Sequence, residues 1–495
     1  MRVYILSLFV VLFIIPTKKV AAIDFTTVDR ETYRLYQEQK WDSVVIIGKE
    51  GLKENIDYFY LRLRIGVSYY WMKKYLFAIE HLRKAHEFNS IDPITTEYLF
   101  LSYLKSGRDG DAHTLIPGMS PLQREQLQVK NSFIEKIQFE SGYILSSDRS
   151  PSNLAMLMGK DSVYGEQDLY GNNTYANLSI KFRIAKWLDF TLAYSYLNFS
   201  KTKYFQYGRT EDHFLGTADS IWGKQYLWSF PTVAYDTSFN YQVKQHEFHA
   251  GATVNLKGGW KIMPAFHYLY VSYPLISSSV NLEVVTDTGY YTGYNNSYFL
   301  FPFTRTNYTY TQKDTTFNNF LASLKISKEM GIFTVGVSGS WSNLNGKTQK
   351  QATLSLSYYP LGSFKFYGTT MATGFFQKKT KRLLVSQILG VELTDWWWAE
   401  ANYTYGDLTN SNIANGAIVY NSTDIINYKA GASMIFQVGK HLQFSVIYQY
   451  FSKESQQTYY TKTIDPVTKE TTLGSKIQNN PYNTNTIIGG ITWKF

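Results

Sequence analysis

The last ten residues, Thr486–Phe495, read T-I-I-G-G-I-T-W-K-F and end the chain on an aromatic side chain. Their odd positions are apolar apart from one glycine, while Thr492 and Lys494 are polar and fall on even positions. A period of two is typical of a β-strand with one apolar and one polar face. The stretch therefore predicts a closing strand that buries or presents its odd residues on a single face.

Within this strand, Gly490-x-x-Trp493-x-Phe495 resembles the closing strand of bacterial outer-membrane β-barrels. That family ends in a glycine and two spaced aromatic residues, which the barrel-assembly machinery reads. The pattern departs from the family at Ile488, where a polar residue is usual. The resemblance implies that Gly490, Trp493 and Phe495 form an assembly signal and that the assembly machinery is a partner.

The same alternation recurs back to residue 133. About 14 strands are predicted, near 134–146, 173–184, 187–199, 241–257, 260–274, 317–328, 332–343, 349–359, 363–374, 382–393, 396–407, 425–438, 441–452 and 483–495. Alternation alone also suits a water-soluble sandwich. The lengths of the connections distinguish a barrel from a sandwich better. Tight turns alternate along the chain with a second set of connections, and this second set includes all the long ones, near 147–172, 200–240, 275–316, 408–424 and 453–482.

Long loops at one end and tight turns at the other are the pattern of an outer-membrane barrel. An even number of strands places the last strand beside the first, and lipid leaves no partner for an open sheet edge. Residues 133–495 are therefore predicted to form an antiparallel transmembrane barrel. Aromatic residues near the turns are expected to face lipid: Trp187, Trp260, Trp397, Trp493 and Phe495. The expected partners of the barrel as a whole are outer-membrane lipid and lipopolysaccharide.

The N-terminal residues 1–22 have the features of a secretory signal peptide. Arg2 precedes an apolar run at 3–15, and a V-A-A triplet at 20–22 precedes the expected cleavage. The apolar run is too short to cross a bilayer as a helix. The mature chain is therefore expected to lie beyond the inner membrane of a Gram-negative bacterium.

Residues 23–120 lack a period of two and instead align with themselves at a spacing of 34. The spacing and the small and large packing positions resemble the tetratricopeptide repeat (TPR), an all-α repeat of paired helices. The resemblance assigns packing roles to Gly66, Tyr69, Ala78, Leu82, Ala85, Tyr103 and Ala112. A periplasmic TPR-like unit can bind a protein or polymer partner, or it can serve as a spacer. Residues 121–132 are expected to be a linker.

Composition excludes several classes of function. The 495-residue chain has no cysteine, so disulfides, thiolate nucleophiles and cysteine-ligated metals are excluded. Its net charge of +10 is dispersed rather than gathered on one element, which argues against nucleic acid as a partner. A mean hydropathy of −0.26 argues against a bundle of apolar membrane helices.

Strand alternation directs a set of charged residues into the barrel lumen. Basic residues outnumber acidic residues in this set, which suggests that the lumen has a mild preference for anions. The alternative is that the charges form ion pairs that stiffen the barrel wall. The candidates are Lys136, Glu140, Lys181, Arg183, Asp189, Glu247, Lys261, Lys325, Lys365, Glu392, Glu400 and Lys429.

No catalytic constellation emerges. His246 and His249 flank Glu247, but residues three apart on a strand face opposite sides, so the two histidines cannot share a metal. Neither a His-Glu-x-x-His nor a Gly-x-Ser-x-Gly motif is present. We therefore predict neither an enzyme nor a cofactor.

The domain order, TPR-like repeats followed by a barrel, resembles exopolysaccharide exporters and surface-lipoprotein assembly modulators. That resemblance implies an outer-membrane export channel whose periplasmic TPR unit recruits cargo or a partner. The alternative is a barrel that transports nothing, anchors a periplasmic adaptor and displays adhesion loops.

Overall fold

The computed structural model describes residues 24–129, 132–148, 162–210, 213–220, 223–229, 232–293, 297–378, 380–464 and 471–495. The predicted signal peptide lies outside these residues. The chain divides into two compact units, residues 1–127 and 128–495.

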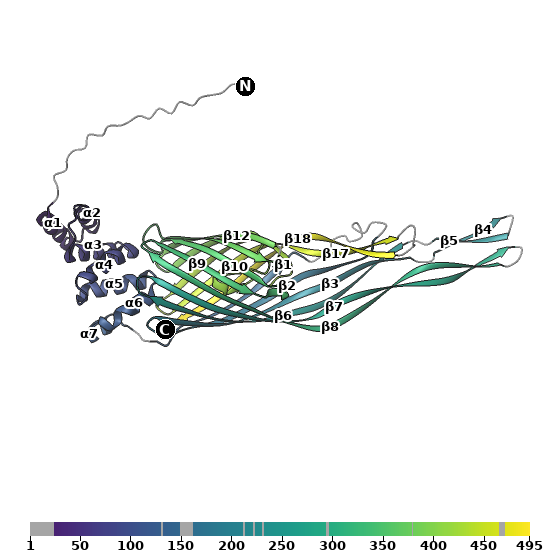
Figure 1. The fold of residues 1–495 in the computed structure, drawn as a ribbon, viewed down its shortest axis with the longest axis horizontal. Coiled ribbons are helices and arrows are strands. Elements are labelled where there is room, and N and C mark those ends of the chain that lie inside the picture. The colour runs from purple at the N-terminus through teal and green to yellow at the C-terminus, as the bar shows by residue number, and fades with distance from the viewer. Residues whose placement is uncertain are drawn as a thin grey trace, which may run out of the picture. The chain divides into compact units, whose positions relative to one another are not determined.

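The first unit is built from helices (Figure 1). The helices are α1 Phe25–Gln37, α2 Trp41–Lys53, α3 Phe59–Trp71, α4 Tyr75–Phe88, α5 Pro93–Lys105, α6 Asp109–Leu115 and α7 Pro121–Gln126. The starts of α1, α3 and α5 are 34 residues apart, and so are the starts of α2, α4 and α6. Among the helices of the described residues, none is both long and apolar enough to cross a membrane.

Small residues let neighbouring helices of this unit approach closely. A Cβ atom added at Gly66 of α3 would lie 2.5 Å from Cγ of Leu82 on α4, a distance that atoms do not adopt. Ala78 and Ala85, also on α4, are fully buried. Tyr69, Tyr103 and Ala112 are buried as well. The residues with predicted packing roles therefore all lie in the interior of the helical unit.

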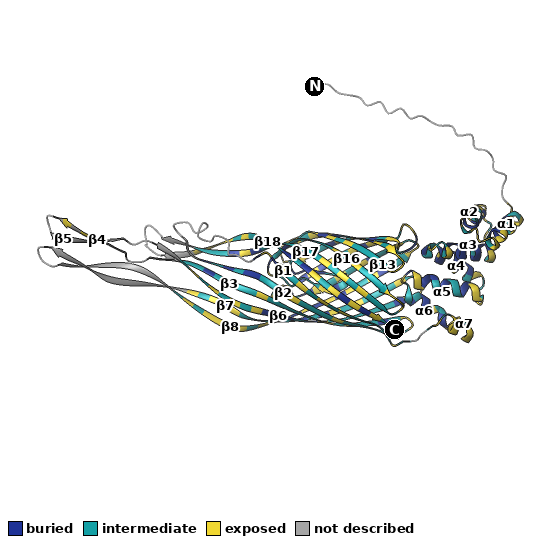
Figure 2. Ribbon diagram, turned by 180° about the vertical axis from the view of Figure 1, so that it is seen from behind, coloured by how far each residue is buried: buried dark blue, intermediate teal, exposed yellow. Residues whose placement is uncertain are grey.

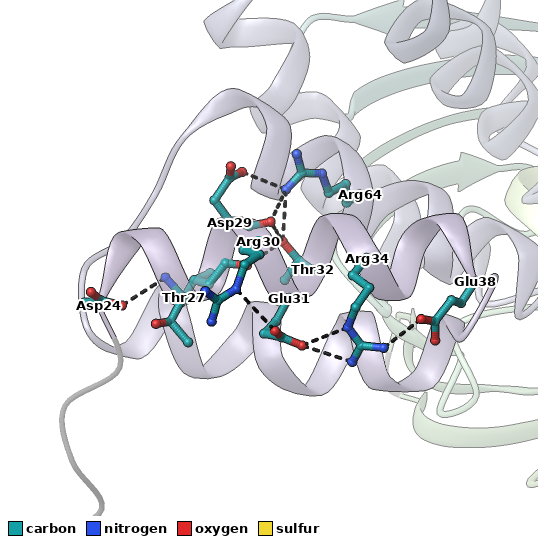
Figure 3. Close-up of polar contacts among 10 residues, drawn as sticks. Asp24, Thr27, Asp29, Arg30, Glu31, Thr32, Arg34, Glu38 and Arg64 are labelled. Atoms are coloured by element: carbon teal, nitrogen blue, oxygen red, sulfur yellow. Dashed lines mark hydrogen bonds and ion pairs between the residues drawn. The ribbon is translucent and has the colours of Figure 1, made fainter.

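Polar contacts complement this packing around α1 (Figure 3). The side chain of Asp24 accepts a hydrogen bond from the Thr27 amide at 2.9 Å and caps the helix. Arg64 of α3 donates to Asp29 Oδ1 at 2.8 Å and to Thr32 Oγ1 at 3.0 Å, which ties α3 to α1. A hydrogen bond from Tyr58, followed by the Arg64 charge, lowers the pKa of the Asp29 carboxyl group.

The second unit is a closed antiparallel barrel of 14 strands. Around the ring the strands are β1 Ile134–Ser146, β2 Ser162–Ala185, β3 Leu188–Thr210, β6 Thr232–Leu256, β7 Trp260–Gly293, β8 Ser297–Met330, β9 Phe333–Ser342, β10 Gln349–Tyr358, β11 Phe366–Gln377, β12 Thr380–Thr394, β13 Trp397–Tyr405, β16 Ile425–Val438, β17 Leu442–Ile464 and β18 Thr471–Lys494. Two further strands, β4 His213–Ser220 and β5 Gly223–Ser229, pair with each other, and β5 pairs with β7.

The ring closes between its first and last strands. β1 pairs with β18 over eleven residue pairs, from Lys136 opposite Lys494 to Ser146 opposite Thr484. β7 pairs with β8, so the described strands of the ring leave no open edge. The predicted fold class is confirmed: helices precede a closed antiparallel barrel of 14 strands.

Four of the five connections that were predicted as long loops contain strand residues, because the flanking strands continue into them within the described ranges. The β7–β8 hairpin, for example, pairs without a register shift from Trp260 opposite Lys328 to Tyr291 opposite Ser297. We call the end of the barrel with the tight turns the turn end and the opposite end the loop end. At the turn end, Gly258 and Gly259 take φ values of +77° and +78°, which favour glycine.

Exposed and buried residues alternate along the barrel strands (Figure 2). The exposed side chains of the outward face include many large apolar residues, among them Leu178, Phe266, Leu354, Leu389 and Ile491. Near the turn end, Trp493 is 45% and Phe495 46% exposed. Trp187 and Trp260 are also exposed, whereas Trp397 is half-buried because it stacks on Trp396 and Phe436.

Candidate functional site: the lumen and its plug loop

The inward face of the barrel is polar because the polar residues of each strand occupy the alternate positions whose side chains point into the lumen. Buried polar residues lie at alternate positions of the strands, for example Ser323 and Ser327 on β8 and Gln349, Gln351 and Ser355 on β10. A polar wall inside an apolar outer face is the reverse of a soluble protein's core. The lumen is therefore the part of the barrel that is suited to polar solutes.

One connection folds into this lumen. We call residues 406–424, between β13 and β16, the plug loop. It contains the short pair β14 Asn412–Ile413 and β15 Ile418–Val419, joined by the 3₁₀ turn Ala414–Gly416. The φ values of +52°, +55° and +82° at Ala414, Asn415 and Gly416 reverse the chain within this turn. Arg382 of β12 ties down the base of the loop, since it pairs with Asp407 and donates to the Thr409 carbonyl at 2.7 Å.

The tip of the plug loop is fixed to the wall by hydrogen bonds. Nδ1 of His267 on β7 lies 2.8 Å from the Gly416 carbonyl oxygen. Ser323 Oγ donates to the Asn415 carbonyl at 2.8 Å, and Asn415 Nδ2 donates to the Met263 carbonyl at 2.8 Å. Since β7 is six strands from β13 in a ring of 14, the loop crosses the lumen to the far wall.

A second set of contacts holds the flank of the loop. Asn412 Nδ2 donates to Ser340 Oγ on β9 at 2.9 Å and to Gln351 Oε1 on β10 at 2.9 Å. The Asn412 backbone amide donates to the same Gln351 oxygen at 2.9 Å, and Gln351 Nε2 donates to the Asn412 carbonyl at 3.3 Å. The loop is thus docked through polar contacts that water can replace.

Several predicted luminal charges are paired near the turn end. Lys181 and Arg183 of β2 contact Glu135 of β1 at 2.7 and 2.9 Å and Asp189 of β3 at 3.4 and 3.2 Å. Lys261 pairs with Glu329 at 2.7 Å. Glu135 and Glu329 were not among the predicted residues. Both lie next to strand ends, where an odd or even position is a weak guide to whether a side chain points into the lumen.

Other predicted charges form hydrogen bonds with uncharged groups or lie near the turn end. Glu140 accepts from Gln138 Nε2 at 2.6 Å, Glu400 accepts from the Tyr367 hydroxyl at 2.7 Å, and Lys429 donates to the Tyr420 hydroxyl of the plug loop at 3.3 Å. Lys136 is half-buried on β1, Glu392 is half-buried on β12, and Lys365 is exposed in the turn before β11. Lys325 lies elsewhere, beside the plug loop.

The histidines separate as the strand geometry predicts. His246 lies on the outward parity, where its Nδ1 is 2.8 Å from the Tyr194 hydroxyl. His249 lies on the inward parity opposite His267, with their ring centroids 5.6 Å apart. His267 Nε2 is 3.2 Å from Glu247 Oε2, a contact that is an ion pair when the ring is protonated. Within the described ranges, no group of three or more acidic or histidine side chains forms a candidate metal site.

The loop end of the barrel narrows through an unusual strand pairing. β1 ends at Ser146, and beyond it β17 pairs directly with β2, from Gln457 opposite Gln167 to Thr461 opposite Ser162. The Gln457 side chain donates to Gln167 Oε1 at 2.8 Å, and both side chains are buried. The β17–β18 hairpin therefore bends across the mouth of the barrel.

A buried cluster of rings and charges lies below this pairing. The rings of Tyr170 and Tyr482 stack with centroids 5.8 Å apart, and the Tyr482 hydroxyl donates to Asp424 at 2.7 Å. Nζ of Lys201 lies 3.9 Å from the Tyr170 ring centroid, and Lys453 contacts the same ring from 5.8 Å. Sequence alternation did not reveal this cluster, because its members come from five separate segments.

No protein-family model matches the chain, and no curated protein matches it. Among solved structures, the P. putida toluene transporter TodX is 8% identical and covers 72% of this chain and 90% of its own, with a TM-score of 0.37. A Pseudomonas aeruginosa FadL homologue is 10% identical and covers 73% and 90%, with a TM-score of 0.36. The translocator domain of autotransporter NalP from Neisseria meningitidis is 10% identical and covers 79% and 99%, with a TM-score of 0.27. At these low scores the fold rests on the strand pairing given above.

Proposed function

We propose that the barrel spans the outer membrane of a Gram-negative bacterium and acts as a transport channel that the plug loop closes. The membrane assignment rests on the exposed outward residues, which form an apolar surface much larger than a soluble monomer tolerates. Ring closure pairs the strand edges that lipid would otherwise leave bare. The exposed aromatic residues at the turn end suit the interface between lipid and water.

One observation carries the channel assignment: a loop crosses the lumen and is held on the far wall by hydrogen bonds. Barrels of this size have room for water once nothing occupies the lumen. The plug loop docks through hydrogen bonds of His267, Ser323, Asn412 and Asn415. Such bonds contribute about 0.5–1.5 kcal/mol each in net terms, so undocking is within reach of thermal motion or a bound partner.

The helical unit would act on the periplasmic side. Its helices repeat every 34 residues, and the residues at the TPR packing positions are buried, both of which support a TPR-like fold. Because the chain enters β1 at the turn end, the helical unit belongs to the same membrane side as the tight turns. We infer that it recruits the cargo or a periplasmic partner protein.

The second candidate is a barrel that anchors and does not transport. The specific observation in its favour is the β17–β2 pairing, which narrows the mouth independently of the plug loop. Strands such as β7 and β8, each 34 residues long, also extend well beyond a bilayer crossing and offer surfaces for adhesion.

Planar-bilayer recordings distinguish the two. The variant replaces residues 409–423 with a four-residue Gly-Ser linker, which the adjacent pairing of Tyr405 with Tyr428 permits. A channel predicts rare openings of the native chain and stable ionic current through the variant. No current through a correctly assembled variant would support the anchor. Deleting residues 24–120 tests recruitment: export should stop while the barrel still inserts.

A further inference from the structure

The barrel wall from β9 to β12 carries an unbalanced positive charge. Between Glu329 and Glu392 the chain contains six lysines, one arginine and no acidic residue. Four of these lysines, which we call the basic rim, are exposed at the loop end: Lys347, Lys350, Lys378 and Lys381. The arginine, Arg382, pairs with Asp407. Within the part of the chain that the structure describes, no carboxylate forms an ion pair with a lysine of the basic rim.

Strand pairing places two lysines of the basic rim in one row with two aromatic residues. Lys350 of β10 lies opposite Trp341 of β9 on one side and opposite Phe376 of β11 on the other. Phe376 in turn lies opposite Lys381 of β12. Neighbouring strands are about 4.8 Å apart, so the Cα atoms of the two lysines are about 10 Å apart. Their flexible side chains can therefore contact the same anionic headgroup.

This row lies where the apolar outward face of the wall ends. On the turn-end side of the row, the outward positions of β9, β10 and β12 are exposed and apolar: Val337, Leu354, Leu356, Leu383, Val385, Leu389 and Val391. The strands β9, β10 and β11 are 10, 10 and 12 residues long, close to the length that crosses a bilayer at a tilt. Aromatic side chains such as Trp341 and Phe376 favour the boundary between lipid and water. The row therefore marks that boundary at the loop end.

The connections beside the row are short, in contrast with the long hairpins elsewhere at the loop end. Residues 343–348 join β9 to β10, and residues 378–379 join β11 to β12. The β7–β8 hairpin continues far beyond this level (Figure 1). Lys347 and Lys378 belong to the two short connections. The basic rim is therefore close to the membrane surface, where a lipid headgroup can reach it.

We propose that the basic rim binds the phosphate groups of lipopolysaccharide, the anionic lipid of the outer leaflet. Lys350 and Lys381 would contact a phosphate at the level of the aromatic row, because an ammonium group forms a strong charged hydrogen bond with phosphate. Lys347 and Lys378 would contact the phosphorylated sugars beyond it. The acyl chains would lie along the apolar outward residues of β9–β12. This inference deepens the proposed function and rests on its membrane assignment, but it does not depend on transport through the lumen.

Binding of lipid A to the full-length chain in detergent micelles, followed by microscale thermophoresis, tests the proposal. The probe is hexa-acylated lipid A with both phosphates, and its dephosphorylated form is the matched control lipid. Phosphatidylglycerol supplies a phosphate on a lipid without sugars. We expect the phosphorylated lipid A to bind at least about tenfold more tightly than either, because only it offers phosphates and apolar chains that match the whole surface. Equal affinity for the two forms of lipid A, or for lipid A and phosphatidylglycerol, would overturn the proposal.

Charge variants locate the binding surface. The double variant Lys350→Gln/Lys381→Gln should weaken binding of phosphorylated lipid A about tenfold or more, while Lys350→Arg/Lys381→Arg should retain most of it. Lys244→Gln/Lys313→Gln is the matched control, because it removes two exposed lysines of β6 and β8 that lie outside the basic rim. Equal losses in the two glutamine variants, or no loss at the basic rim, would contradict the assignment. Heat-modifiable migration in gels verifies that each variant has assembled.

This proposal and the proposed function fail separately. A purified chain that stays soluble without detergent and does not enter lipid vesicles would overturn the membrane assignment itself. A barrel that inserts into vesicles but binds both forms of lipid A equally would overturn only the role of the basic rim.

Discussion

Nδ1 of His267 lies 2.8 Å from the carbonyl oxygen of Gly416, although 149 residues separate them in the chain. This contact joins the wall of the barrel to the tip of the loop that crosses its lumen. Because a carbonyl oxygen only accepts, His267 must carry a proton on Nδ1. The other ring nitrogen, Nε2, lies 3.2 Å from Glu247 Oε2 without a hydrogen bond, so the hydrogen bond to Gly416 orients the ring.

Replacing His267 with alanine should loosen the plug loop. The change leaves the buried Gly416 carbonyl without its donor, at a cost of about 1–3 kcal/mol to the docked state. We expect about a tenfold or greater rise in the leak of a small solute from proteoliposomes. His246→Ala is the control, since it removes the same side chain from the outward face of the adjacent strand. An equal leak in the two variants would contradict a docking role for His267.

Gly490 and its neighbour Gly489 provide a matched test of the closing strand. A Cβ at Gly490 would lie 2.4 Å from Ser445 Oγ on β17 and 3.3 Å from Glu140 Cγ on β1, whereas one at Gly489 would meet nothing within 4 Å. Gly490→Val should destabilise the closed ring by about 1–3 kcal/mol through overpacking. The folded fraction in bacterial outer membranes, read as heat-modifiable migration, should fall for Gly490→Val and stay near the native level for Gly489→Val. The reverse order would show that the two faces of β18 have been misassigned.

His81 should make the stability of the helical unit depend on pH. Burial, with the nearby Arg62 charge, lowers the pKa of His81 from 6.5 to about 3 in the folded state. Between these values the unfolded chain binds more protons, so stability is present above pH 6.5 and declines as the pH falls. From pH 7.5 to pH 5 the loss due to this residue is about 2 kcal/mol.

Urea unfolding of the helices, followed by circular dichroism at 222 nm in the full-length protein, measures this effect. A His81→Phe variant should show a smaller loss of stability between pH 7.5 and pH 5 than the native chain. Identical pH dependence in the two proteins would show that His81 is not the titrating group.

Local sequence predicted the strands well wherever one face meets the lumen. Residues 134–146 were predicted as a strand and form β1 with the same bounds, and residues 332–343 contain β9. The extensions of the strands into the long hairpins were not predicted, because the buried positions change between odd and even residue numbers along them. Leu269 and Val271 of β7 bury odd positions, whereas Ile276 buries an even one against Phe205 of the neighbouring hairpin. A constant period of two is therefore absent from the extended strands.

The functional features were less predictable than the fold. Luminal charges such as Lys181 and Arg183 could be predicted from their odd or even positions on the strand, but their shared partner Glu135 could not. The docking of the plug loop depends on residues such as Ser323 and Asn415, which lie 92 positions apart. Loop length gave the one available signal, since a long connection at the loop end can fold into a lumen. Its destination is set by tertiary contacts that no local pattern contains.

The most direct test of the account is to lock the plug loop in its docked position and record the current. Asn412 Nδ2 and Ser340 Oγ are 2.9 Å apart, and the native chain has no cysteine, so an Asn412→Cys/Ser340→Cys variant carries a single pair of thiols. In planar bilayers, the reduced variant should open, a short thiol-reactive cross-linker should abolish its current, and reduction of a cleavable linker should restore it. Each single-cysteine variant should keep its current under the same treatment. Undiminished current through the cross-linked double variant would contradict the claim that this loop closes the channel.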